Sequence, residues 1–273
     1  MGIFDGYLIC SDFDGTMAYE AKISKENCAA IAYFQSEGGI FCPCSGRQPS
    51  FFHDYSEFFR PNGPVITLNG SVIVRYTDDP ENDEVLYCGG MSSELTEELV
   101  RDARDLPGMK HTWVCCDNTC YVILPTGKQP EGDPGERKLI EPEEIKGFIQ
   151  KVVFVHDGLH LDEIRAALEP KYRDRLAFGS SWGSGLEAQL IGTTKGDSVL
   201  RVKEMVGAHT LVCVGDYEND LTMLKAADIS YAVGNAIDCL KAVADRVTVP
   251  VNEHAIVAIV KDLERDSAER RKN

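Results

Sequence analysis

Short apolar runs alternate with amphipathic stretches at both ends of this chain of 273 residues. The runs have the length of strands, and the stretches between them repeat apolar residues with the period of a helix. Strands that alternate with helices form a parallel sheet with helices on both faces. The pattern therefore predicts an α/β fold with a Rossmann-like core. The predicted strands are YLIC (7–10), GIFCPC (39–44), PVITL (64–68), TLVCVG (210–215), ISYAV (229–233) and RVTVP (246–250).

Residues that favour helix ends mark the helices between these strands. Ser24 is suited to cap the N-terminus of the first helix, and Gly38 with Gly39 is suited to end it. Gly207 ends a later helix in the same way. The predicted helices cover residues 24–37, 49–59, 194–206, 219–227 and 236–244, and a C-terminal helix reaches about Arg265.

The middle of the chain, residues 77–186, has a different pattern. It opens with the acidic run DDPENDE and contains a predicted hairpin around Asp117 and Asn118 and a long turn-rich loop. Helices are expected near residues 93–105 and 161–168, between further strands. This mixture predicts an inserted α+β domain at 77–186, so that residues 1–76 and 187–273 together form the core domain.

The charge of the chain limits its partners. Its formal net charge is −16, and its calculated isoelectric point is near 4.8. Nucleic acids and anionic membranes attract positive surfaces, so neither is an expected partner. A small anionic substrate remains compatible if a bound cation and a few Lys or Arg side chains reverse the sign locally. Since no apolar stretch reaches a membrane span and no basic leader precedes Asp5, we expect a cytoplasmic protein.

Ten cysteines are present, but their spacing does not indicate a metal site. No C-x-x-C pair occurs, and zinc-finger spacing is absent. Without an export signal, we expect reduced thiols that pack as small apolar side chains. Cys44 is the exception to consider, because it directly precedes Ser45 in the candidate site and a redox-sensitive thiol could lie there.

Chemistry-bearing residues follow the ends of several predicted strands. In parallel α/β sheets ligands bind beyond the carboxyl ends of the strands, so these residues are expected to converge. Four carboxylates, a hydroxyl, an arginine and a lysine would then meet at one edge of the sheet. The residues are Asp12 and Asp14 after the first strand, Ser45, Gly46 and Arg47 after the second, Asp216, Asn219 and Asp220 after TLVCVG, and Lys195 in the first turn of a helix.

Each of these features also has a purely structural explanation. Asp14 with Gly15 is a common turn dipeptide, and Asn69 with Gly70 suits a type I′ hairpin turn. Carboxylates such as Asp216 are favoured at helix starts by the helix dipole. Lys195 is harder to explain in this way, because a cation in a first helical turn opposes the dipole. The joint occurrence at one sheet edge favours a functional site.

Together these motifs resemble the haloacid dehalogenase superfamily, in particular its Cof-type, subfamily IIB phosphatases. The resemblance covers the core on both sides of the insert, and the insert matches in placement and size as a C2-type cap domain. One departure is NEHAIVAIV (252–260), where the subgroup usually has a Gly before the last helix. The motifs that carry the resemblance are SDFDGT (11–16), CSGR (44–47), LNG (68–70), TTKGDSV (193–199), VGDYENDLTML (214–224) and AVGNA (232–236).

The resemblance implies a role for each candidate residue. Asp12 would be the nucleophile and Asp14 the general acid and base, which should hold a proton when the substrate binds. Lys195 and Ser45 would bind the transferring phosphoryl group. The implied phosphate site also includes Gly46, Arg47, Asn69 and Asn219, and the implied Mg²⁺ ligands are Asp12, Asp14, Asp216 and Asp220, the last of which would ligate or position the ion.

These residue types suit the hydrolysis of a phosphate monoester. A carboxylate that attacks a dianionic phosphoryl group is repelled by it, so a cation has to neutralise the charge between them. The resemblance therefore implies a Mg²⁺-dependent phosphatase that acts on small phosphorylated metabolites, sugar phosphates first, through an aspartyl-phosphate intermediate. Covalent capture on Asp12 would divide the reaction into two steps.

Two alternative functions remain compatible with the sequence. A phosphomutase of the same fold would return the phosphoryl group to the sugar, but it needs a second phosphate site, and no clear Arg or Lys cluster occurs in the insert. A non-catalytic metabolite-binding regulator would keep the pocket without turnover. The oligomeric state cannot be read from the sequence. Trp113 and Trp182 lie in the insert, where Trp182 could stack on a sugar or pack in the core.

Overall fold

The computed structural model describes residues 2–55, 59–116, 118–130 and 137–270. The chain forms two compact units. The first unit takes Met1–Tyr87 and Lys195–Asn273, and the second takes Cys88–Thr194. Among the described helices, none combines the length and the apolar character that a bilayer span needs.

The first unit is built on a parallel sheet of five strands in the order β18-β17-β16-β1-β4. The predicted α/β fold with its Rossmann-like core is therefore confirmed. Four of the predicted strands form here at nearly the predicted bounds, because their apolar runs are buried on both faces. These four are β1 (Tyr7–Ser11), β4 (Ile40–Pro43), β16 (Thr210–Gly215) and β17 (Ile229–Ala232), and the fifth, β18 (Arg246–Val247), is shorter than its predicted run 246–250.

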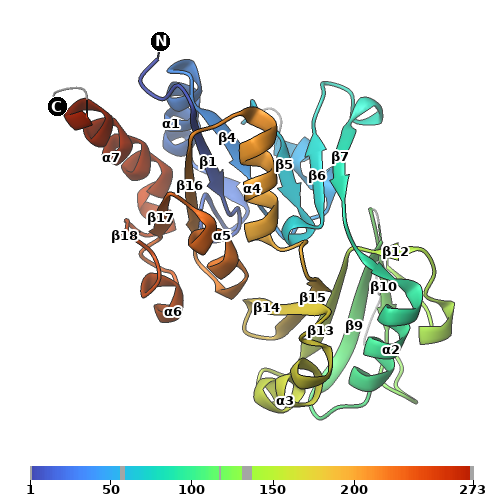
Figure 1. Cartoon of the computed structure of the whole chain (residues 1–273). Helices are drawn as coiled ribbons and strands as arrows, with labels where there is room; N and C mark the ends of the chain where they lie inside the picture. The colour runs from blue at the N-terminus through green and yellow to red at the C-terminus, as the bar shows by residue number, and fades with distance from the viewer. Residues whose placement is uncertain (1, 56–58, 117, 131–136, 271–273) are drawn as a thin grey trace. The chain divides into compact units, whose positions relative to one another are not determined.

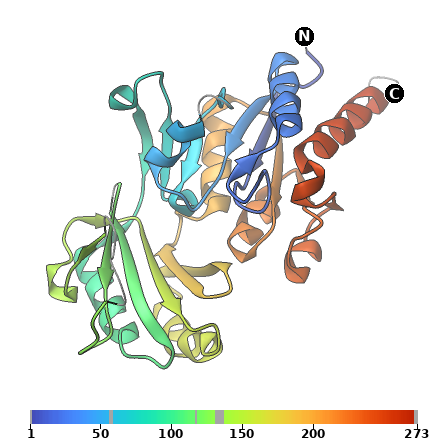
Figure 2. The ribbon, with the colours of Figure 1, turned by 180° about the vertical axis from the view of Figure 1, so that it is seen from behind.

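Helices cover both faces of this sheet. α4 and α5 pack against each other in front of the strands in Figure 1, and α1 packs against α7 on the other face, seen in Figure 2. Ser24 caps α1 as predicted, because its side chain accepts a hydrogen bond from the Asn27 amide. The helices are α1 (Lys25–Ser36), α4 (Lys195–Val206), α5 (Leu221–Ala226), α6 (Asp238–Lys241) and α7 (Ala255–Arg270).

The run 64–68 forms a strand as predicted, and a parallel bridge between Cys44 and Ile66 joins it to the end of β4. It forms β5 (Val65–Thr67), which pairs antiparallel with β6 (Val72–Arg75) across the Asn69 turn, and β7 (Glu84–Cys88) completes this small sheet. The stretch 49–59 is not an α-helix but a 3₁₀ helix at Pro49–Tyr55, whose aromatic rings pack around Phe13, and residues 56–58 lie outside the described part.

Short elements complete the first unit. β2 (Ala18–Tyr19) and β3 (Lys22–Ile23) form a hairpin after β1, and Glu20 and Ala21 at its turn both have positive φ. Further 3₁₀ helices occupy Leu68–Gly70, Pro80–Asn82, Glu218–Asp220 and Val251–Glu253.

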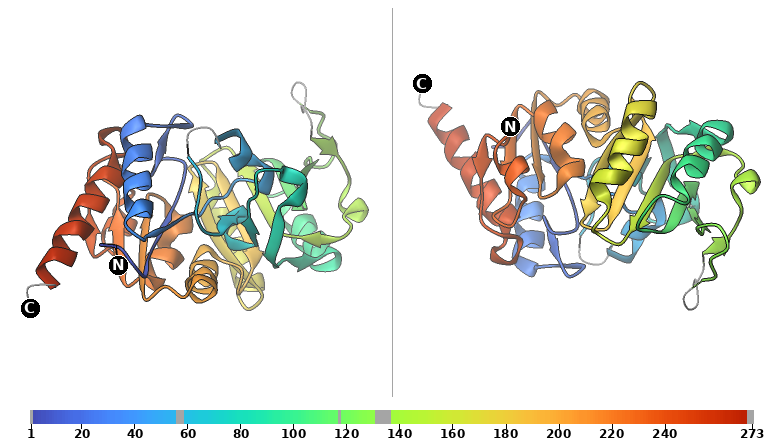
Figure 3. Two further views of the ribbon diagram at one scale, coloured as in Figure 1. Left: turned by 90° about the horizontal axis from the view of Figure 1, so that it is seen from above. Right: turned by 90° about the horizontal axis from the view of Figure 1, so that it is seen from below.

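The second unit is an α+β sheet of six strands in the order β11-β10-β9-β13-β15-β14. α2 and α3 lie on one face of this sheet, in front of the strands in the right-hand view of Figure 3. The elements are β8 (Met91–Ser92), α2 (Ser93–Ala103), β9 (Met109–Cys116), β10 (Thr119–Ile123), β11 (Lys138–Leu139), a 3₁₀ helix (Pro142–Glu144), β12 (Phe148–Ile149), β13 (Lys151–His156), α3 (Leu161–Tyr172), β14 (Leu176–Trp182) and β15 (Gly185–Leu190).

The junctions between the units lie C-terminal to the predicted ones at 77 and 187. β7 pairs with β6, so the chain leaves the first unit only after Tyr87. β15 pairs along its length with β13 and β14, so the chain returns only at Lys195. The predicted hairpin forms from β9 and β10; of its two turn residues, Asp117 lies outside the described part.

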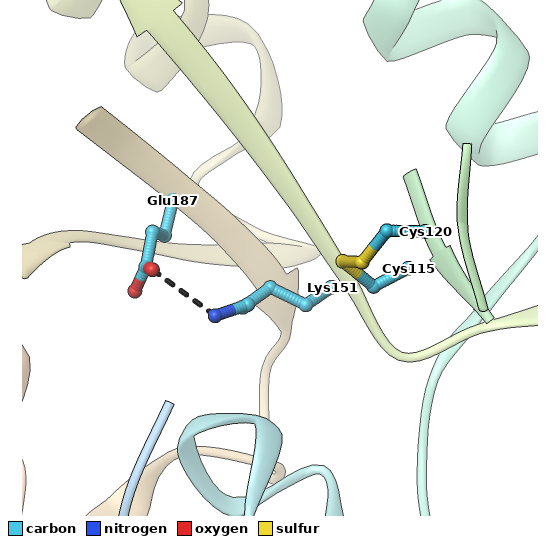
Figure 4. The surroundings of a disulfide bond; sticks show 4 residues. All are labelled: Cys115, Cys120, Lys151 and Glu187. Atoms are coloured by element: carbon cyan, nitrogen blue, oxygen red, sulfur yellow. Dashed lines mark hydrogen bonds and ion pairs between the residues drawn. A yellow bond between two sulfur atoms is a disulfide. The ribbon is translucent and has the colours of Figure 1, made fainter. Parts of the chain in front are cut away.

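The cysteines depart from the expectation in one place. Cys115 and Cys120 face each other across β9 and β10 and form a disulfide (Figure 4). The cysteine spacing does not indicate this disulfide, because only the register of the hairpin places Cys115 opposite Cys120. Cys10, Cys42, Cys44 and Cys213 are free and buried in the first unit, as expected of small apolar side chains.

Candidate active site

Asp12 lies directly after β1, at the carboxyl edge of the parallel sheet. Its amide donates a hydrogen bond of 2.9 Å to the carbonyl of Val214 on β16, which continues the pairing of the two strands. Gly15 follows with a φ of 80°, and a Cβ there would come within 2.4 Å of an Asp216 carboxylate oxygen. The turn after β1 therefore needs glycine to approach the end of β16.

Lys195 links the carboxylates of two strand ends. It is the first residue of α4, and its Nζ donates to Asp12 Oδ1 and to Asp220 Oδ1, both at 2.6 Å. The ammonium group is fully buried, and Asp12 and Asp220 are 6% and 0% exposed. Gly196 allows this placement, because a Cβ there would lie 2.5 Å from the Thr222 carbonyl oxygen at the start of α5. A cation in the first turn of a helix opposes the helix dipole, and here two carboxylates compensate for that unfavourable position.

Asp216 is the third carboxylate of this cluster. One oxygen each of Asp12, Asp216 and Asp220 lies within 4.8 Å of the others. Thr16 Oγ1 donates to Asp216 Oδ1 at 3.1 Å. Asp220 Oδ2 accepts the amides of residues 216 and 217 at 2.9 and 3.2 Å, so this carboxylate fixes the loop after β16.

The cluster carries more negative charge than one ammonium group balances. Burial raises the pKa of Asp12 well above its usual range, although Lys195 acts in the opposite direction. Burial and the charge of Asp220 raise the pKa of Asp216 to about 7. Burial alone would lower the pKa of Lys195, but the carboxylates of Asp12 and Asp220 outweigh it and raise the pKa. A hard divalent cation such as Mg²⁺ fits this set of oxygen donors and the surplus negative charge.

Asp14 points to a different partner. Arg47, in the loop after β4, donates from Nε and from a terminal nitrogen to the two oxygens of Asp14, each at 2.8 Å. The guanidinium group also lies over the ring of Phe51, 4.6 Å from the ring centroid. Both members of the ion pair are nearly half exposed. Both carboxylate oxygens of Asp14 are therefore engaged by Arg47.

The remaining predicted residues line the loops beside this cluster. Ser45 is buried and its Oγ accepts the Arg47 amide at 3.2 Å, with Gly46 between them in the chain. Asn69 takes a left-handed conformation, with a φ of 56°, and its amide donates to the Ser45 carbonyl. Asn219 Nδ2 donates to Asn69 Oδ1 at 3.1 Å. Asn69 therefore serves both as the hairpin turn and as a contact of Asn219.

Two residues of this region had no predicted role. Thr16 binds Asp216, as described above. Asn235 Nδ2 donates to the Gly15 carbonyl at 2.9 Å, and its Oδ1 accepts the Val251 amide at 2.8 Å, so it ties the turn after β1 to the C-terminal segment. They lie in the motifs SDFDGT and AVGNA, whose spacing does not indicate which residues they contact.

Cys44 does not have the environment of a reactive thiol. It is fully buried, and burial raises the pKa of its thiol well above the usual range, against the opposing effect of Lys195. Reactive cysteines are accessible and have a lowered pKa. The expected redox-sensitive role of Cys44 is therefore not favoured by its surroundings.

Comparison with known proteins identifies relatives over nearly the whole chain. The phosphatase YwpJ of Bacillus subtilis is 30% identical over 302 aligned positions, covering 94% of this chain and 99% of YwpJ. The 5-amino-6-(5-phospho-D-ribitylamino)uracil phosphatase YcsE of Bacillus subtilis is 25% identical, covering 88% of this chain and 89% of YcsE.

Solved structures share the fold. A structure described as a subclass IIB sugar phosphatase of the haloacid dehalogenase superfamily has a TM-score of 0.75 at 18% identity and covers 94% of this chain and 98% of its own. A haloacid dehalogenase-like hydrolase from B. subtilis has a TM-score of 0.74 at 20% identity, with 93% and 98% coverage. The sequence profile of the haloacid dehalogenase-like hydrolases matches residues 9–260. The chain therefore belongs to the haloacid dehalogenase-like hydrolases, as a phosphatase of the Cof type.

Proposed function

We propose that the enzyme hydrolyses small phosphorylated metabolites with Mg²⁺, through an aspartyl-phosphate on Asp12. The observation that carries this proposal is the buried ammonium of Lys195, held by Asp12 and Asp220 at the carboxyl edge of the sheet. The ammonium of Lys195 donates to Oδ1 of Asp12. The other carboxylate oxygen of Asp12 would attack the phosphorus atom. The ammonium then neutralises an oxygen of the transferring group.

The carboxylates of Asp12 and Asp216 and the backbone carbonyl of Asp14 would hold the Mg²⁺ ion. When bound, the ion supplies the positive charge that allows an anionic nucleophile to approach an anionic phosphoryl group. Asp220 would position rather than ligate the ion, because both of its oxygens already accept hydrogen bonds. Its bonds to the amides after β16 keep Asp216 directed toward Asp12.

Asp14 would donate a proton to the leaving group and then accept one from the attacking water. For this step Asp14 has to separate from Arg47, whose guanidinium would then bind the anionic substrate. Ser45, Gly46, Asn69 and Asn219 would complete the phosphate site. Ser45 and Asn69 are buried, and the hydrogen bond between Asn69 and Asn219 would hold the two amides in place.

The substrate class is a separate part of the proposal. We expect sugar phosphates to be the first class to test, with the second unit acting as a C2-type cap and the enzyme acting in the cytoplasm. The neighbours are described as a subclass IIB sugar phosphatase and a phosphatase of a ribitylaminouracil phosphate. Nucleic acid is not an expected substrate, because the net charge of −16 repels it.

The experiment is phosphate release over a panel of phosphorylated metabolites with the purified enzyme. We expect Mg²⁺-dependent release that falls at least about a thousandfold in Asp12→Asn, because this change removes the attacking carboxylate at nearly constant volume. Acid quenching during turnover, followed by peptide mass spectrometry, should find a phosphoryl group on Asp12.

The alternatives predict different results. Transfer of phosphate between positions of a sugar, with stimulation by a sugar bisphosphate and no net release, would favour the phosphomutase. Saturable binding without release under Mg²⁺ would favour the regulator. Full activity of Asp12→Asn would remove the proposed mechanism.

A further inference from the structure

The two tryptophans of the chain lie together in the second unit. The ring centroids of Trp113 on β9 and Trp182 on β14 are 6.0 Å apart, with a tilt of 35°. The His111 ring lies 5.5 Å from Trp113 with a tilt of 34°. The Arg137 guanidinium lies over the Trp113 ring, 4.4 Å from its centroid. We call these four side chains the aromatic platform.

The platform is on the face of the sheet opposite α2 and α3. Successive side chains of a strand point to opposite faces. Val114 on β9 and Phe154 on β13 belong to the core that these helices cover, so Trp113 and its register partner Val153 point to the other face. Both indole rings and the imidazole are half-buried, and Arg137 is exposed. A ligand could therefore reach these ring surfaces.

Gly185 allows Trp182 to lie flat against β15. A Cβ at Gly185 would meet the indole ring at 2.3 Å, so any larger residue would displace the ring. Gly185 pairs with Val155 of β13, which in turn pairs with His111 of β9. Trp182 and His111 thus lie in one row of the sheet, and Trp113 lies in the neighbouring row, opposite Val153. The position of the Trp182 ring depends on a residue without a side chain.

A buried polar group borders the platform. Lys151 Nζ donates to Glu187 Oε1 at 3.1 Å, and Ser181 Oγ donates to Glu187 Oε2 at 2.9 Å. Lys151 and Glu187 are 5% and 3% exposed, and their side chains point toward each other in Figure 4. Glu187 shares its register row with Val153 and Trp113. A fixed carboxylate therefore lies on the same face of the sheet as the rings.

The imidazole of the platform is uncharged at neutral pH. Burial lowers the pKa of His111, and the charges of Arg137 and Lys110 lower it further. An uncharged imidazole, two indoles and a delocalised guanidinium all present flat surfaces. Such surfaces stack on a flat ring, and a Trp–Arg pair adds a cation–π contribution.

We propose that the aromatic platform binds the planar heteroaromatic ring of a metabolite. The buried ion pair of Lys151 and Glu187 would lie beside that ring. The binding itself does not depend on the chemistry of the first unit.

The binding test uses uridine and ribose, which differ by the presence of a heteroaromatic ring and carry no phosphate. Calorimetry on the whole enzyme without Mg²⁺ should give about tenfold tighter binding for uridine, since stacking of a base on aromatic side chains contributes on this scale. Uridine should also change the tryptophan fluorescence, which in this chain comes only from the platform.

Two variants test the platform directly. Arg137→Gln changes an exposed side chain, so the protein should fold, and Trp113→Leu removes the central ring. Each should weaken uridine binding several-fold, while Leu159→Ala, at a residue of the same unit that is 85% exposed, should not. Equal affinity for ribose and uridine, no binding of uridine, or unchanged uridine binding in folded Arg137→Gln would overturn the proposal.

Discussion

At the scale of single residues, the site depends on an imbalance of charge. Asp12, Asp216 and Asp220 share one buried ammonium, that of Lys195. Burying this many carboxylates is unfavourable unless they are paired or protonated. The raised pKa values of Asp12 and Asp216 express this cost. A divalent cation and a proton therefore compete for the same oxygens.

This competition predicts that Mg²⁺ binding depends on pH. The pKa of Asp216 is raised from 3.8 to about 7 in the metal-free protein, so the carboxyl has to lose a proton before it binds the ion at lower pH. Below pH 7, the apparent affinity for Mg²⁺ should fall about tenfold per pH unit for each proton displaced. Calorimetric titration with Mg²⁺ at about pH 6 and about pH 8 measures this change in affinity.

The same shift has a consequence for stability with a definite sign. Between pH 3.8 and about 7 the folded protein retains a proton on Asp216 that the unfolded chain has lost. The free energy of unfolding of the metal-free protein should therefore fall as the pH rises through this window and level off above it. Asp216→Asn should reduce this slope, and the part that remains comes from Asp12, whose pKa is also raised. For the Mg²⁺ titration, equal affinities at about pH 6 and about pH 8 would contradict the raised pKa of Asp216.

Some of these residues could be assigned to one site from the sequence alone, and others could not. Asp12, Lys195, Asp216 and Asp220 could be placed together because each follows a strand end or opens a helix, and the sheet brings these points to one edge. The Arg47–Asp14 ion pair and the Thr16–Asp216 bond could not be predicted. Spacing along the chain does not determine side-chain rotamers, and these partners are far apart in the sequence.

At the scale of elements, α7 begins at an unusual residue. His254, just before the helix, has a φ of 62° and a ψ of 58°, which is the left-handed region. This is the position where the sequence departs from the subgroup pattern by lacking a Gly. The imidazole Nδ1 lies 2.9 Å from Ser24 Oγ, the cap of α1, so a side-chain contact accompanies the strained backbone.

The departure predicts a matched pair of substitutions. His254→Gly and His254→Ala both lose the contact with Ser24, but only Ala pays the steric cost of a left-handed conformation. We expect the Gly variant to be more stable than the Ala variant by about 0.5–1 kcal/mol, after allowance for the larger freedom of Gly in the unfolded chain. Urea unfolding of the two proteins measures the difference. An Ala variant as stable as the Gly variant would show that this turn relaxes.

At the scale of the whole molecule, the two units are stabilised by different means. The first buries an apolar core on both faces of a parallel sheet, and the second adds a covalent link between β9 and β10. The change in sequence pattern near residue 77 indicated two parts of the chain. The compact units divide farther along the chain, after Tyr87 and Thr194, because β7 pairs with β6 and β15 pairs with β13 and β14.

The disulfide predicts a local effect on stability. Cys120→Ser removes a link that closes a short loop, and we expect a loss of about 2 kcal/mol in the free energy of unfolding. Hydrogen exchange should record faster opening in Cys88–Thr194 and unchanged protection of β1 and β16. The same result is expected for the wild-type protein under a reducing agent, with Cys239→Ser as a control at an exposed free thiol. Faster exchange throughout the chain would mean that the units unfold together.

Lys195 is also the residue at which the chain re-enters the first unit, directly after Thr194. The preceding turn is held closed by Thr193, whose amide and hydroxyl both donate to the Leu190 carbonyl at the end of β15. Only one peptide bond therefore separates the last residue of the inserted unit from the cation of the reaction centre. A substitution that opened this turn would shift the start of α4 and, with it, the ammonium group that Asp12 and Asp220 hold.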